Sequence, residues 1–311
     1  MPNIVFIGSF TPMQRVLYTL KRMSGLKCLA LYTIPGDLKI KELAHNLNIK
    51  ANDIDILKTQ QGKDQLKRIN PGWIFNVNSQ FIFPKEILSI PRAGCLNLHP
   101  GKLPEYAGLH AHQWAIRNDE KLFASTINWM EEKVDAGPIA YAQEFPITPK
   151  DTGLSLFMKC MDVGAEIALK VLNDISAGRM PPKIEQDLSK RKVYSVKDSA
   201  SGDISWQWSS TRIYNFIRAV DYYPFHSPTY IPSCILNDGR RINILKAKPS
   251  AHSSKQAGEL VAVIDEGIVI GARDELSLLI TKIRSEDDRV IQGKQIAEYL
   301  GRAVGEKIVN E

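Results

Sequence analysis

Cysteine is scarce in this sequence of 311 residues, and long hydrophobic runs are missing. The four cysteines, Cys28, Cys95, Cys160 and Cys234, lie among apolar neighbours with no C-x-x-C spacing, so we expect reduced core thiols. No run approaches the roughly 20 apolar residues that a membrane span needs, and no signal-peptide pattern opens the chain. We therefore expect a cytoplasmic protein with no membrane partner.

A dinucleotide-binding fingerprint is also missing. GSFTP (8–12) follows the first apolar run and resembles a phosphate-binding turn. It lacks the G-x-G-x-x-G spacing that brings a helix onto a pyrophosphate. A dinucleotide site of that kind is not expected.

The net charge of +6 is unevenly distributed. Residues 1–199 carry 26 Lys and Arg against 20 Asp and Glu, whereas residues 200–311 carry 14 of each. The C-terminal part is therefore no basic surface, and nucleic acid is not the expected partner. One local basic cluster could meet a phosphate-bearing ligand, although such runs are usually a solvated face: Lys183, Lys190, Arg191, Lys192 and Lys197.

Strand and helix patterns alternate through the first half of the chain. Apolar runs at 3–9, 26–33 and 73–83 predict buried strands, and amphipathic stretches such as 38–49 and 154–178 predict helices. This alternation indicates an α/β fold with a doubly wound, Rossmann-like parallel sheet. A chain of this length is expected to hold more than one core.

The composition changes after the 154–178 helix. Pro181 and Pro182 introduce a polar, basic stretch, and five short strand candidates at regular spacing then predict a small β-barrel. We predict a catalytic domain at 1–185, a linker at 186–203 and a smaller C-terminal subdomain at 204–311.

Three polar residues that suit catalysis belong to the segment 95–139. Asn97 and His99 are two residues apart at the end of an apolar run, so both side chains should project to one face of a strand. Asp135 follows in an Asp-Ala-Gly turn, so its carboxylate could lie beside that strand end.

Acyl transfer to an amine needs the chemistry that these residues offer. His99 would act as general base or acid, Asn97 would donate to a developing oxyanion, and Asp135 would orient or charge the imidazole. The competing interpretation is a strand-end histidine that caps a turn, and spacing alone leaves both open.

Two other features invite a functional interpretation. His110 and His112 form an H-x-H pair, but no third ligand has suitable spacing, so no metal is expected. The aromatic-rich segment 206–225 is typical of packing more than of ligand stacking. It is also a surface through which a homodimer could form.

The stretches NLHPGKLPEYAG (97–108) and VDAGPI (134–139) closely resemble the folate-dependent formyltransferase family. The resemblance covers nearly the whole chain. Segment 201–220 looks like the helix that opens the family's C-terminal subdomain, and 257–283 looks like its OB-like barrel.

The resemblance implies transfer of a formyl group from the co-substrate N10-formyltetrahydrofolate to an amine. Asn97, His99 and Asp135 match the family's catalytic residues. The resemblance also implies where the pterin binds, namely along Phe81, Ile82, Phe83, Glu132, Val134, Gly137 and Ile139. We expect Lys102, Tyr106 and Gly108 to contact the acceptor.

The sequence departs from the family pattern in three places. Gly101 stands where a serine is usual, Ala107 where an arginine is usual, and PFHSP (224–228) replaces the usual Pro-Gly-Ala. The first two lie near the acceptor, so they bear on substrate identity more than on reaction type.

The acceptor is expected to be a small molecule. Methionyl-tRNA formyltransferases resemble the chain but carry a long basic insertion after the second strand, where this chain runs directly through TIPGDLKIKEL. With a neutral C-terminal part as well, phosphate contacts are poorly supplied. A nucleotide-linked amino sugar is the favoured acceptor, with hydroxyornithine as a close alternative and methionyl-tRNA as another. A formyltetrahydrofolate hydrolase, or an inactive folate- or nucleotide-binding module, is a further alternative.

Overall fold

The computed structural model describes residues 1–195, 198 and 202–309, which form two compact units. Unit 1 comprises Met1–Ala111, Leu122–Pro146 and Phe157–Tyr194, and unit 2 comprises His112–Lys121, Ile147–Leu156 and Ser195–Glu311. Lys197 and part of the expected 186–203 linker lie outside the described residues. The domain boundaries drawn from the sequence stay predictions.

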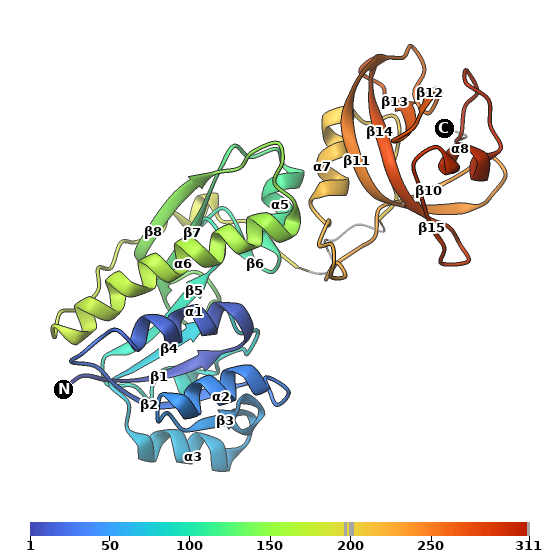
Figure 1. Ribbon diagram of the computed structural model, residues 1–311. Helices are drawn as coiled ribbons and strands as arrows, with labels where there is room; N and C mark the ends of the chain where they lie inside the picture. The colour runs from blue at the N-terminus through green and yellow to red at the C-terminus, as the bar shows by residue number, and fades with distance from the viewer. Residues whose placement is uncertain (196–197, 199–201, 310–311) are drawn as a thin grey trace. The chain divides into compact units, whose positions relative to one another are not determined.

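A seven-stranded sheet forms the centre of unit 1, in the order β3-β2-β1-β4-β5-β7-β8 (Figure 1). Its strands are β1 (Asn3–Gly8), β2 (Lys27–Thr33), β3 (Ala51–Asp53), β4 (Trp73–Val77), β5 (Gly94–His99), β7 (Leu122–Trp129) and β8 (Ile139–Pro146). The first five are parallel, and β7 and β8 are antiparallel to their neighbours. The expected α/β sheet is thus confirmed, with a mixed edge that the sequence pattern did not predict.

Helices cover both faces of this sheet because its strands alternate apolar side chains between the faces. Ile4 and Phe6 of β1 belong to the core under α1 (Phe10–Leu20), α2 (Leu38–Asn46) and α6 (Gly153–Ser176). Val5 and Ile7 belong to the opposite core, under α3 (Gln60–Ile69) and α4 (Lys85–Leu88). This is the layered arrangement of a doubly wound fold.

Short elements complete unit 1. They are the 3-10 helices η1 (Ile54–Lys58) and η2 (Leu188–Lys190) and the two-residue strands β6 (Ala107–Gly108) and β9 (Val193–Tyr194). β6 and β9 pair in parallel, with Ala107 opposite Val193 and Gly108 opposite Tyr194. Residues 186–194, which the sequence assigns to a linker, are therefore anchored to unit 1.

Unit 2 contains an antiparallel sheet around a separate hydrophobic core. Its elements are α7 (Ser210–Arg218), β10 (Ser233–Ile235), β11 (Arg241–Ser253), β12 (Leu260–Ile264), β13 (Gly267–Gly271), β14 (Leu276–Arg284), β15 (Val290–Gln292) and α8 (Gln295–Leu300). Most of α5 (Ala111–Arg117) also belongs to this unit. Trp206 is fully buried among these elements, which agrees with a packing role for the aromatic-rich segment. Its description as an OB-like barrel stays a prediction.

All four cysteines are free. Cys95, Cys160 and Cys234 are buried, as expected of core thiols, whereas Cys28 is only partly buried. Among the described residues no helix is long and apolar enough to span a membrane.

Candidate active site

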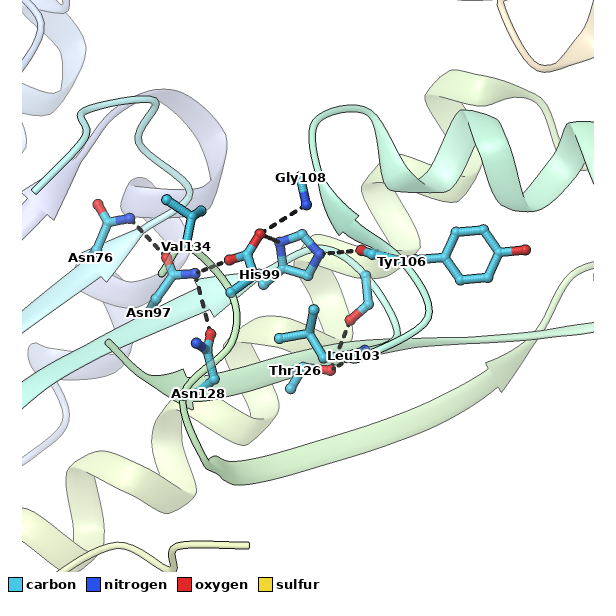
Figure 2. Close-up of polar contacts among 12 residues, drawn as sticks. Asn76, Asn97, His99, Leu103, Tyr106, Gly108, Thr126, Asn128 and Val134 are labelled. Carbon is cyan, nitrogen blue, oxygen red and sulfur yellow. Dashed lines mark hydrogen bonds and ion pairs between the residues drawn. The ribbon is translucent and has the colours of Figure 1, made fainter. Parts of the chain in front are cut away.

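The candidate site lies at the carboxyl end of β5, inside unit 1. β1, β4 and β5 are parallel neighbours, so their carboxyl ends share one edge of the sheet, where α/β proteins commonly bind ligands. His99 is the last residue of β5, and Asn97 precedes it by two positions on the same face. Asp135 comes from the loop between β7 and β8. The structure brings these three predicted residues together. Figure 2 shows Asn97 and His99 at this strand end.

The carboxamide of Asn97 is held by three side chains. Its Oδ1 accepts a hydrogen bond of 2.8 Å from Nδ2 of Asn76, and its Nδ2 donates to Oδ1 of Asn128 and Oδ1 of Asp135, each at 3.3 Å. Both hydrogen bonds from Nδ2 are longer than the usual N–H···O distance. The amide hydrogens of Asn97 are therefore oriented but loosely held, and Asn97 itself is only partly buried.

The two ring nitrogens of His99 have different partners. Nε2 lies 2.7 Å from the carbonyl oxygen of Tyr106, and a carbonyl can only accept, so Nε2 carries a hydrogen and donates it. Nδ1 faces Oδ2 of Asp135 at 3.7 Å, and both side chains are buried. In the neutral ring Nδ1 is then the basic nitrogen, and a proton that it takes up faces a carboxylate.

The carboxylate of Asp135 is held from the opposite side as well. Oδ2 accepts a 2.9 Å hydrogen bond from the backbone N–H of Gly108. The backbone at Asp135 has a φ of +56°, a left-handed conformation that aspartate tolerates better than most residues. Gln186 stabilises this turn, since its Nε2 donates to the carbonyl oxygens of Asp135 at 3.0 Å and Gly137 at 2.6 Å.

Gly101 leaves room for the imidazole. A Cβ at this position would lie 2.4 Å from Nε2 of His99 and 2.9 Å from the carbonyl oxygen of Tyr106. Real Cβ atoms essentially never make such close contacts, so a side chain here must displace the ring or the loop. The loop is otherwise held by Thr126, whose hydroxyl donates to the Gly101 carbonyl at 2.8 Å. The departure from the family's serine therefore bears directly on where the His99 ring lies.

A segment at 182–194, which we name the strap, contacts both loops of the site. Ile184 forms an antiparallel bridge with Ile139, and Arg191 donates to the Val134 carbonyl at 2.8 Å. At its end, the Tyr194 ring stacks on that of Tyr106, with centroids 5.4 Å apart. The strap thus holds the Asp135 loop and the Tyr106–Gly108 segment in one arrangement.

The residues expected at the pterin site have differing environments. Ile82 and Val134 expose large apolar side chains, at 69% and 49% exposure, whereas Phe83 is buried and packs edge-on against Phe81. Glu132 is exposed and pairs with Lys85. Gly137 packs against the Trp129 carbonyl, which a Cβ would approach to 2.2 Å. Ile139 begins β8 and bridges to Ile184.

The residues expected to contact the acceptor are equally diverse. Lys102 is partly exposed, and its Nζ lies 2.8 Å from a carboxylate oxygen of Glu144. The Tyr106 side chain is buried, and its backbone carbonyl is the group that faces His99. Gly108 has a φ of +91°, and a Cβ there would lie 2.2 Å from the Tyr194 carbonyl, so glycine permits the β6–β9 pairing.

The two histidines of the H-x-H pair lie in packed surroundings. Nε2 of His112 hydrogen-bonds to the hydroxyl of Tyr222, which also accepts from Gln113 at 3.2 Å. Burial lowers the pKa of His110 below its usual value. Within the described ranges, no group of three or more His, Cys, Asp and Glu side chains is arranged to hold a metal ion.

Sequence reasoning missed three side chains of the site: Asn76, Asn128 and Gln186. Asn76 stands in the otherwise apolar strand WIFNV, and Asn128 ends the polar run of the buried strand LFASTINW, so a polar residue in a buried strand was the available signal. Gln186 had no such signal, because its partners are backbone carbonyls distant in sequence.

Comparison with known proteins agrees with this fold. The formyl transferase family matches residues 4–172, and the formyl transferase C-terminal domain matches residues 197–300. The chain therefore belongs to the formyl transferase family, and its class of enzyme is formyltransferase. Among curated relatives, a methionyl-tRNA formyltransferase of Clostridioides difficile (strain 630) is 30% identical over 262 residues, covering 84% of this chain and 82% of that one.

Solved structures share the fold at lower sequence identity. An N-formyltransferase from Helicobacter canadensis, in complex with folinic acid and dTDP-3-aminofucose, matches with a TM-score of 0.70 at 19% identity and covers 90% of this chain and 99% of that one. A sugar 3N-formyltransferase, WlaRD, in the presence of dTDP and 5-N-formyl-THF, matches with a TM-score of 0.68 at 20% identity, with coverages of 90% and 97%.

Proposed function

We propose that this enzyme transfers the formyl group of N10-formyltetrahydrofolate to a primary amine of a nucleotide-linked amino sugar. The observation that carries the proposal is the cluster of an amide donor, an imidazole and a carboxylate: Asn97 lies 3.3 Å from Asp135, and Asp135 lies 3.7 Å from His99. Asn97, His99 and Asp135 are the proposed catalytic residues.

Each of the three would have one role in the reaction. As the amine nitrogen bonds to the formyl carbon, the carbonyl electrons move to oxygen, and an amide hydrogen of Asn97 stabilises the resulting charge. The amine proton passes to Nδ1 of His99, where Asp135 stabilises the charged ring. When the bond to N10 breaks, N10 keeps the electron pair and takes the proton from Nδ1 of His99, so the N-formylated amine and tetrahydrofolate are the products.

The folate would bind along the same edge of the sheet. Ile82 and Val134 expose apolar side chains, and Ile82 follows β4, the neighbour of β5. Exposed apolar groups beside polar backbone suit a flat ring with hydrogen-bonding edges. Phe81, Phe83, Glu132, Gly137 and Ile139 would shape this site from the same two loops, and the buried Phe83 would do so only by packing beneath.

The acceptor is proposed to be small because phosphate contacts for a nucleic acid are few. Only residues 34–37 separate β2 from α2, and Asp37 caps α2 and accepts from the Phe10 N–H at 2.6 Å, so no basic insertion occurs there. Residues 200–311 carry equal numbers of acidic and basic side chains. Affinity for nucleic acid depends largely on such phosphate contacts. Sugar nucleotides are the acceptors named for structures that share this fold.

Methionyl-tRNA is a second candidate acceptor, because the curated relatives at 29–31% identity are methionyl-tRNA formyltransferases. An assay separates the candidates. The protein is incubated with N10-formyltetrahydrofolate and either amino-sugar nucleotides, hydroxyornithine or charged initiator tRNA, and tetrahydrofolate release is followed. Release with amino-sugar nucleotides is expected. Formylation of tRNA alone would refute the proposed acceptor, and release without any acceptor would indicate a hydrolase.

Lys102, Tyr106 and Gly108 are the proposed acceptor contacts. Lys102 is the one whose side-chain charge can be tested directly, since it is partly exposed and Glu144, one of its partners, is exposed as well. If Lys102 binds an acceptor phosphate, Lys102→Ala raises the KM for the acceptor and leaves the KM for formyltetrahydrofolate unchanged. Glu144→Gln controls for loss of the ion pair alone.

A further inference from the structure

Three asparagines lie in register across three neighbouring strands. Asn76 of β4 is opposite Asn97 of β5, and Asn97 is opposite Asn128 of β7. Figure 2 shows the Asn97 carboxamide between the other two. Asn76 is 4% exposed and Asn128 is 1% exposed, so both flanking side chains are nearly sealed from water.

The direction of the Asn97 carboxamide follows from its charged neighbour. An ionised carboxylate only accepts hydrogen bonds, so the group of Asn97 that faces Asp135 must be its NH2. The Oδ1 of Asn97 then points to the other side, where Nδ2 of Asn76 donates to it at 2.8 Å. Asp135 and Asn76 therefore favour the same orientation of the Asn97 carboxamide, Asp135 through its NH2 group and Asn76 through its oxygen.

The side chain of Asn76 donates to Asn97, but among the described residues its own oxygen is left unpaired. Its Oδ1 is buried and has no hydrogen-bond partner within the described part of the chain. Leaving a buried acceptor unpaired lowers stability, and an apolar residue of similar size at this position would avoid that loss. The remaining contribution of Asn76 is the hydrogen that it donates to Asn97.

We propose that Asn76 is a positioning residue for formyl transfer, which keeps the NH2 of Asn97 directed at the reacting oxygen. The inference rests on the proposed function, because it assigns Asn97 as the oxyanion donor. Without a donor at position 76, the Asn97 carboxamide would be held in this orientation only by its two 3.3 Å hydrogen bonds to Asn128 and Asp135. Its NH2 group would then be less firmly directed at the negative charge that develops in the transition state, so kcat would fall while substrate binding persists.

Two charge-matched variants test the proposal. Asn76→Asp places an acceptor against Oδ1 of Asn97 and favours the reversed carboxamide. Asn128→Asp adds the same charge on the other side of Asn97 and preserves the acceptor that Nδ2 of Asn97 already uses. It removes the hydrogen bond that Nδ2 of Asn128 donates to the Trp129 carbonyl at 3.0 Å, so it is the more disruptive change at its own position. The full-length protein is assayed for kcat, for KM with formyltetrahydrofolate, and for the Kd of 5-formyltetrahydrofolate. A thermal melting curve of each variant shows whether it is folded.

We expect Asn76→Asp to lower kcat at least about tenfold more than Asn128→Asp does, because the oxyanion donor is weakened. We expect the KM for formyltetrahydrofolate and the Kd of 5-formyltetrahydrofolate to change less than about threefold, because binding does not depend on that donor. Equal losses of kcat in the two variants would overturn the proposal. If Asn76→Asp does not fold, Asn76→Ala is assayed in its place. A wild-type kcat in Asn76→Ala would also overturn the proposal.

Failure of the proposed function gives a different pattern. Wild-type protein that transfers no formyl group to any acceptor and releases no tetrahydrofolate would refute the function and this inference together. Wild-type turnover with identical losses in the two aspartate variants would refute the inference alone.

Discussion

The Nδ1 atom of His99 faces a carboxylate oxygen of Asp135 at 3.7 Å, while Nε2 of the same ring donates to the carbonyl of Tyr106 at 2.7 Å. The second contact assigns the tautomer, because a carbonyl cannot donate. The nitrogen available for proton uptake is therefore the one beside the carboxylate. His99 and Asp135 are expected to act as one unit.

Removal of either member of this pair should abolish most of the turnover. We expect His99→Ala and Asp135→Asn each to lower kcat at least about a hundredfold, in line with lost general acid/base catalysis. Because they act as a unit, the double variant should be little slower than either single variant. Asp55→Asn, at an exposed aspartate paired with Lys58, is the control. Near-normal turnover in either variant would remove that residue from the catalytic assignment.

Enlarging Gly101 should disturb the same histidine. Gly101→Ala places a methyl group 2.4 Å from Nε2 of His99, so the ring must leave the Tyr106 carbonyl or the loop must move. We expect kcat to fall at least about tenfold, because small displacements of catalytic groups have large effects on rate. Gly36→Ala is the matched control, since nothing lies within 4 Å of a Cβ there. Wild-type kcat in Gly101→Ala would contradict the placement of the imidazole.

Gln186 should affect catalysis through the Asp135 turn. In Gln186→Glu, an ionised carboxylate would face the carbonyls of Asp135 and Gly137, to which the amide now donates. We expect a lower Tm and a kcat reduced by at least about tenfold, since two part-buried hydrogen bonds are replaced by repulsion. Gln292→Glu, at an exposed position on β15, makes the same chemical change without such partners. Equal behaviour of the two variants would show that the strap does not hold the turn.

Cys95 should resist thiol reagents in the folded protein. Burial raises the pKa of its thiol to about 12, so the reactive thiolate is scarce at neutral pH. A disulfide-exchange reagent at pH 8 is expected to label Cys95 only after denaturant is added, as read by peptide mass spectrometry. Rapid labelling under native conditions would contradict the burial of this residue.

The sequence by itself determined the class of fold and the reaction. Apolar periodicity is a local property of the chain, so the alternating strands and helices of unit 1 could be predicted before any contact was known. The sequence could also predict catalytic residues, because a strand end and a turn are encoded locally. These residues are Asn97, His99 and Asp135. The family resemblance was confirmed over both parts of the chain.

Only the tertiary structure decided how these residues are held. The antiparallel edge at β7 and β8, the strap across the two loops and the register of Asn76 with Asn97 depend on pairings between distant segments. Strand patterns specify which residues are buried, but they do not specify which strand lies beside which. The direction of the Asn97 carboxamide and the basic nitrogen of His99 follow from those pairings, because each depends on a partner brought from elsewhere in the chain.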